Sequence, residues 1–154
     1  MKAANDFEAP GADLNEPLVL ARVVDWFGAS GILEGAIQDG EMVPDFELPN
    51  AEGTAVSLQD LLDRGPVVIT FTLGARSSRC RHSLLALQAA LAAIEALGGA
   101  VIALTPDAPP VSRQLRDAEG LTFDLLSDFE GHLAALFGVA YRPPLAVRDW
   151  LAFL

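Results

Sequence analysis

Cysteine and histidine are scarce in this chain of 154 residues, which has one cysteine, Cys80, and two histidines, His82 and His132. A single cysteine cannot form a disulfide within the chain, and it excludes any site that needs two thiolates from one chain. The two histidines are isolated and have no acidic partner at metal-ligand spacing. We therefore expect no metal ion and no other cofactor.

Basic residues are also few. The chain has 10 Lys and Arg against 21 Asp and Glu, a formal net charge of -11 at pH 7. An acidic surface repels phosphate backbones, so we expect no nucleic-acid partner. The same repulsion disfavours binding to anionic membrane surfaces.

The sequence also lacks the marks of secretion and of a membrane span. Its first residues, MKAANDFEAP, are acidic where a signal peptide has a positive end and an apolar stretch. The most apolar run, residues 83–104, contains Gln88, Glu95 and a Gly98–Gly99 break. These features are typical of a buried helix followed by a buried strand. Together with the lone cysteine, they predict a cytoplasmic protein.

The remaining composition is that of a globular domain, with 51% hydrophobic and 20% charged residues. Residues 1–14 are polar and read as a loose tail. From Glu16 onward, apolar residues that include Trp26 and Phe27 recur at helical spacing. We assign residues 1–39 to this tail and helical extension, and residues 40–154 to the main domain.

Strand and helix patterns alternate along the main domain. A hairpin (residues 46–48 and 54–57) and a short helix capped by Ser57 come first. The run PVVITFTL is typical of a central buried strand. The alternation predicts a mostly parallel sheet with helices on its faces. Its later elements are a helix from Ser77 or Ser78 to about 97, a strand over 100–106, a helix over 109–119, a strand over 123–128 and a helix over 131–138.

Cys80 lies just beyond the strand that ends at Leu73, where open α/β sheets place their chemistry. Free backbone N–H groups and the helix dipole favour a thiolate at such a helix start. Nearby cations act in the same direction. A lone cysteine is more often a small buried apolar residue, but this position favours a functional thiol. The cations are Arg76, Arg79, Arg81 and His82.

Four segments carry a specific resemblance: PDFELPNAEGTAVSLQDLL, the buried strand, the Cys80 helix ending in ALGGAVIALTPD, and LLSDFEGHLAALFGV. In type and order they resemble the peroxiredoxins of the alkyl hydroperoxide reductase and thiol-specific antioxidant family. The resemblance covers roughly residues 40 to 140. It implies a thioredoxin-like α/β fold, a mostly parallel central sheet with helices on both faces, here with an N-terminal helical extension.

The resemblance also implies roles for particular residues. The family motif P-x-x-x-T/S-x-x-C places Cys80 at the peroxide-reactive position and Ser77 at the hydroxyl position. The hydroxyl would hydrogen-bond the thiolate and the incoming peroxide, while backbone N–H groups polarise the O–O bond. Relatives also place an arginine beside the thiolate from a late strand, and Arg142 is the candidate here.

The chain departs from the family at the motif itself. Leu73 stands where the motif has proline. A close branch has W-C-x-x-C at this turn, but Arg76 and Ser77 replace the Trp and the first Cys. Thiol–disulfide exchange within one chain is therefore excluded.

The end of the chain can be aligned in two ways. In one, Pro143 is a cis-proline that introduces a strand over Leu145 to Asp149. In the other, residues 141–154 follow a helical segment and the last strands are absent. Either way the apolar end, Trp150 to Leu154, needs cover, so we predict that it folds onto the domain or crosses into a partner, with a homodimer favoured.

Two functions remain open. The first is a one-cysteine peroxidase, in which Cys80 attacks a hydroperoxide, becomes a sulfenic acid and is reduced by an external thiol. The second is a redox-inactive binding or regulatory module that keeps the fold. Ser77, Cys80 and the arginines favour the first, whereas Leu73 and the short C-terminus favour the second.

Overall fold

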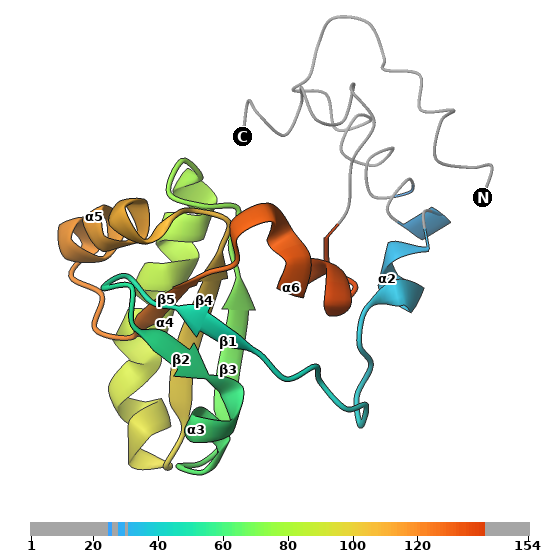
Figure 1. Cartoon of the computed structure of the whole chain (residues 1–154), viewed down its shortest axis with the longest axis horizontal. Helices are drawn as coiled ribbons and strands as arrows, with labels where there is room; N and C mark the ends of the chain where they lie inside the picture. Colours follow the sequence, from blue (N-terminus) through green and yellow to red (C-terminus); the bar gives the residue numbers. More distant parts are fainter. Residues whose placement is uncertain (1–24, 26–27, 30, 141–154) are drawn as a thin grey trace, which may run out of the picture. The chain divides into compact units, whose positions relative to one another are not determined.

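The computed structural model describes residues 25, 28–29 and 31–140 (Figure 1). The chain forms two compact units, one of residues 1–43 and 135–154, the other of residues 44–134. The expected helix around Trp26 and Phe27 lies outside the described residues. So do Arg142, Pro143 and the expected strand over residues 145–149. The boundary between residues 39 and 40 stays a prediction.

In the first unit, helix α2 (Ile32–Gly35) begins after Gly31, which has a left-handed φ of 73°. The N–H of Ile37 donates to the carbonyl of Phe137 at 3.2 Å. Gly138, the last residue of the helix expected over 131–138, has a φ of 70° and follows the end of α6 (His132–Leu136). A Cβ there would collide with the backbone of Gly35, so this close approach requires glycine.

The second unit is built on a parallel sheet in the order β3-β4-β5. Its strands are β3 (Val67–Phe71), β4 (Ala100–Thr105) and β5 (Asp124–Ser127). The register pairs Phe71 with Leu104 and Leu104 with Leu126. All three expected strands are confirmed, but among the described residues β4, not β3, is central. Each β3 residue retains some exposure.

Two helices connect these strands, α4 (Ser78–Ala96) and α5 (Pro109–Glu119). Strand-helix-strand connections of this kind are the usual way to join parallel strands. In Figure 1, α4 lies behind the sheet and the β1–β2 hairpin lies in front of it. No helix in the described part of the chain is both long and apolar enough to span a bilayer.

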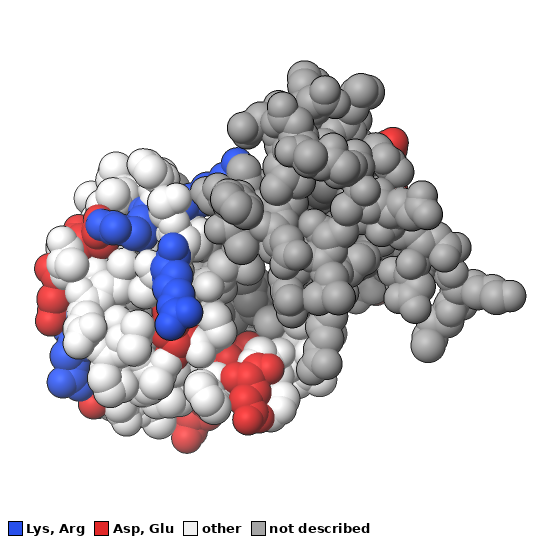
Figure 2. Space-filling view, turned by 90° about the horizontal axis from the view of Figure 1, so that it is seen from above, with Lys and Arg blue, Asp and Glu red and all other residues white. Residues whose placement is uncertain are grey.

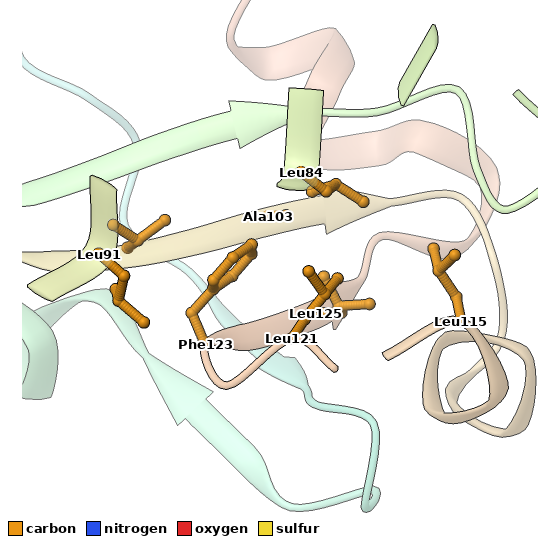
Figure 3. Packing of buried hydrophobic residues seen from close by; sticks show 8 residues of the cluster. Leu84, Leu91, Ala103, Leu115, Leu121, Phe123 and Leu125 are labelled. Atoms are coloured by element: carbon orange, nitrogen blue, oxygen red, sulfur yellow. The ribbon is translucent and has the colours of Figure 1, made fainter. Parts of the chain in front are cut away.

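The core on the α4 side of the sheet joins apolar side chains of both helices and two strands (Figure 3). Alternation along β4 sends Val101 and Ala103 to this side, and Ile102 and Leu104 are buried on the opposite one. Burial on both sides explains the continuous apolar run that the sequence shows for this strand. The cluster consists of Leu84, Leu91, Val101, Ala103, Leu115, Leu121, Phe123 and Leu125.

The hairpin consists of β1 (Glu47–Pro49) and β2 (Ala55–Ser57), which pair antiparallel. The first strand was expected to stop before Pro49, but Pro49 faces Ala55 as its last residue. A two-stranded sheet tolerates proline because it can sit at an edge without donating to the ladder. Ser57 caps α3 (Leu58–Leu62) as expected, accepting a hydrogen bond from the N–H of Asp60 at 3.0 Å.

Two arginines of α5 hold the hairpin turn. Arg113 Nε donates to the carbonyl of Ala51 at 3.0 Å. Arg116 forms an ion pair with Glu52 and a second with Asp117. Hydrogen bonds to Glu52 and then to Asp117 raise the pKa of the Arg116 guanidinium. The turn is thus joined to the helix that follows β4.

Candidate functional site

Cys80 is the third residue of α4, and two backbone relationships define its position. The Oγ of Ser77, the N-cap residue, accepts a hydrogen bond from the N–H of Cys80 at 3.3 Å. The N–H of Leu73 donates to the Sγ of Cys80 at 3.2 Å. The cysteine is half-buried and unpaired with any other sulfur. The sulfur therefore lies between the end of β3 and the first turn of α4, as the sequence predicted.

The loop between β3 and α4 is held by the end of β4. Thr72 extends the pairing of the strands, since its N–H donates to the carbonyl of Leu104 at 2.9 Å. Its hydroxyl donates to the same carbonyl at 3.2 Å and accepts from the N–H of Gly74 at 3.3 Å. The N–H of Ala75 donates to Asp107 Oδ2 at 2.6 Å. These two contacts, of Thr72 with Leu104 and of Ala75 with Asp107, are the anchors of the loop, and both lie within two residues of Leu73.

The cations near Cys80 differ in what they contact. Arg81 forms an ion pair with Glu119 of α5, whose side chain is only 11% exposed. Arg76 and Arg79 are exposed and have no ion-pair partner among the described residues. The first turn of α4 contains no acidic residue. Figure 2 shows Lys and Arg side chains interspersed with Asp and Glu side chains on the described part of one face.

The two histidines do not join the sulfur. His82 Nδ1 lies 2.8 Å from the carbonyl of Ser78, one turn earlier in the same helix. The side chain of His132 is 81% exposed, and its Nε2 lies 3.6 Å from Glu130 Oε2. Within the described ranges, no three His, Cys, Asp or Glu residues cluster closely enough to hold a metal ion.

A cavity of about 150 Å³ opens beside the loop, with Thr72 and Leu73 in its wall. The rest of its lining is mostly apolar and includes Phe71 and Leu104. Asp128 is the buried acidic residue of this wall, and it caps α6 by accepting from the N–H groups of residues 133 and 134. Its carboxylate is thus already committed to a structural role.

Of the predicted site residues, the structure brings Cys80 and Ser77 together. The hydroxyl of Ser77 acts as a helix cap, and its contact with a substrate stays a prediction. Arg142 lies outside the described residues. Sequence reasoning missed the N–H of Leu73 and the carboxylate of Asp107. Asp107 had one available signal, because it lies two residues after β4, the strand that follows the Cys80 helix.

Comparisons with known proteins cover the same region. The AhpC/TSA family model matches residues 40–150. A Mycobacterium tuberculosis protein that is named as a peroxiredoxin is 35% identical to this chain over 105 residues. The match covers 67% of this chain and 67% of that protein. A second such protein is 34% identical over 99 residues, 64% of this chain. The chain spans only 62% of the length of that relative.

A solved structure shows the same arrangement of elements. The crystal structure of peroxidoxin BcpB from Mycobacterium tuberculosis matches with a TM-score of 0.64 at 29% identity. The match covers 70% of this chain and 69% of that chain. It confirms the expected thioredoxin-like α/β fold.

Proposed function

This chain belongs to the AhpC/TSA family, the family of the peroxiredoxins, and on that premise we propose that it is a thiol-dependent peroxidase of the one-cysteine type. The observation that carries the proposal is the hydrogen bond from the N–H of Leu73 to the Sγ of Cys80. The sulfur also lies in the first turn of a 19-residue helix that has no acid there. Both features stabilise negative charge on sulfur.

In the first step, the Cys80 thiolate attacks the terminal oxygen of a hydroperoxide. The S–O bond forms as the O–O bond breaks, and the departing alkoxide takes up a proton and leaves as an alcohol. Cys80 is oxidised to a sulfenic acid. We assign the organic part of such a substrate to the mostly apolar cavity of about 150 Å³ that Leu73 lines.

In the second step, an external thiol attacks the sulfenic sulfur, which gives a mixed disulfide and water. A second thiol then displaces Cys80 as a thiol and leaves as a disulfide. The chain has no second cysteine to do this itself. We place the reaction in the cytoplasm, where reducing thiol pools are available.

Three further parts of the proposal concern residues around this centre. The Ser77 hydroxyl contacts the incoming peroxide, and Arg142 supplies a guanidinium beside the thiolate. Residues 40–154 form the catalytic domain, and residues 1–39 form an extension to it.

The active species is a homodimer in which the apolar end of the chain is covered. Light scattering on the full chain and on a version ending at Asp149 tests the last point, since equal monomers would refute it.

A second candidate function is a redox-inactive binding or regulatory module with the same fold. The observation that favours it is Leu73, which replaces the proline of the family motif. The two candidates differ in one measurable property, the reaction of Cys80 with peroxide.

The deciding experiment treats the folded protein with one equivalent of cumene hydroperoxide or hydrogen peroxide. Intact mass, loss of free thiol and trapping of sulfenic acid by a dimedone probe are followed over time. The matched control is the same chain unfolded in urea, where Cys80 is present without its surroundings. We expect oxidation at Cys80 to be much faster in the folded chain, and Cys80→Ser to show none. Equal rates in the folded and unfolded chains would support the regulatory module instead.

A further inference from the structure

The carboxylate of Asp107 joins the turn after β4 to the loop that precedes Cys80. Its Oδ2 accepts a hydrogen bond from the N–H of Ala75 at 2.6 Å and another from the Thr105 hydroxyl at 3.1 Å. The N–H of Asp107 in turn donates to the Thr105 hydroxyl at 3.2 Å. Thr105 is 2% exposed, so the carboxylate is oriented by a buried group at the end of the central strand.

The same carboxylate occupies the space where a side chain at residue 74 would begin. A Cβ at residue 74 would lie 2.9 and 3.0 Å from the two oxygens of Asp107. Gly74 also has a φ of 91°, a conformation that other residues rarely adopt. The glycine therefore allows a contact between loop and carboxylate that a larger residue would prevent.

Leu73 lies between the two anchors of this loop. On one side the hydroxyl of Thr72 bonds the carbonyl of Leu104, and on the other Asp107 holds the N–H of Ala75. The side chain of Leu73 is 73% exposed, so packing does little to fix this residue. The direction of its N–H, which points to the Sγ of Cys80, thus depends on the flanking anchors.

We propose that Asp107 is a positioning residue for Cys80. It holds the loop so that the N–H of Leu73 stays directed at the sulfur, and it acts without touching the sulfur or the substrate. The inference rests on the proposed function only in that the sulfur is taken as the reacting atom. Its effect on thiol chemistry can be measured whether or not the protein turns over peroxide.

The test compares Asp107→Ala, which removes the acceptor, with Asp107→Asn, which keeps an oxygen that can accept from Ala75. The control is Asp60→Ala, which removes one negative charge from the exposed face of α3, where no side-chain bond of Asp60 is lost. Two rates are measured on full-length protein well below the unfolding temperature. One is oxidation of Cys80 by cumene hydroperoxide, and the other is its alkylation by iodoacetamide.

We expect both rates to fall about tenfold in Asp107→Ala, the effect of losing one hydrogen bond to a charged group. Asp107→Asn is expected to recover most of the wild-type rate, and Asp60→Ala to match wild type. A purely structural role would lower the unfolding temperature of Asp107→Ala but leave the reactivity of the folded protein unchanged. That result, or equal loss in Asp107→Ala and Asp60→Ala, would overturn the inference.

Two outcomes are kept separate by the alkylation assay. If the wild-type protein does not react with peroxide but its alkylation rate depends on Asp107, the proposed function fails and the positioning role stands.

If Asp107→Ala does not fold, Thr105→Val provides the second variant, because it removes the hydroxyl that orients the carboxylate and keeps the side-chain volume. A wild-type alkylation rate in folded Thr105→Val and a low rate in Asp107→Asn would together refute the role.

Discussion

The N–H of Leu73 donates to the Sγ of Cys80 at 3.2 Å, across the turn that joins β3 to α4. A proline has no N–H and could not make this contact. The residue that departs from the family motif is therefore the residue that hydrogen-bonds the sulfur. In the proposed peroxidase this N–H stabilises negative charge on the sulfur, whereas the absence of the motif proline is the feature that favours the redox-inactive module.

Replacing Leu73 by proline should slow the oxidation of Cys80. The variant loses one donor to sulfur, and we expect a rate about tenfold lower. Leu73→Ala is the matched control, since it trims the exposed side chain and keeps the N–H. Stopped-flow oxidation by hydrogen peroxide measures both. A rate in Leu73→Pro at or above that of wild type would mean that shielding by proline outweighs the lost bond.

Ser77→Ala should cost about 1 kcal/mol of unfolding free energy, because the cap of α4 is lost. It should also slow the reaction with peroxide by more than this small loss of stability explains. Ser78→Ala is the control, as Ser78 is the next residue and makes no capping bond. Urea unfolding and the oxidation rate are measured on both variants. Oxidation at the wild-type rate in Ser77→Ala would leave Ser77 with the capping role alone.

Gly74→Ala should destabilise the protein more than the positive φ of residue 74 alone would explain. Both Gly74 and Gly53 have positive φ, 91° and 82°. A Cβ would meet the Asp107 carboxylate at Gly74, whereas it would meet nothing within 4 Å at Gly53. We expect Gly53→Ala to lose about 1 kcal/mol and Gly74→Ala to lose more, with slower alkylation of Cys80 only in the latter. Equal losses with unchanged alkylation would contradict the described contact.

Arg79→Gln should slow the reaction of Cys80 with a dianionic aromatic disulfide more than with an uncharged dipyridyl disulfide. We expect a difference of roughly two- to threefold at low salt, and a smaller one at high salt, because an exposed charge is screened. Arg64→Gln is the control, since Arg64 follows α3 and precedes β3 at the opposite end of that strand. The same change for both disulfides would indicate a structural effect of Arg79 instead.

Local patterns in the sequence predicted most of the second unit. Ser57 and Ser77 cap helices where their hydroxyls precede helical runs. The continuous apolar run of residues 100–105 became the central strand because both of its sides are buried. The position of Cys80 at a helix start was also local information, since strand, turn and helix are contiguous there.

The partners of that helix start were decided only by the tertiary structure. Asp107 is 32 residues from Ala75 in the chain, and Glu119 is 38 residues from Arg81. No local periodicity records such pairs, because their members meet only in the folded chain. For Asp107, the parallel register brings the end of β4 beside the loop after β3. The three nearby arginines could be counted from the sequence. The sequence did not show that Glu119 pairs with Arg81, or that Arg76 and Arg79 have no ion-pair partner among the described residues. The N–H directed at the sulfur belongs to the backbone, where residue type carries no signal unless it is proline.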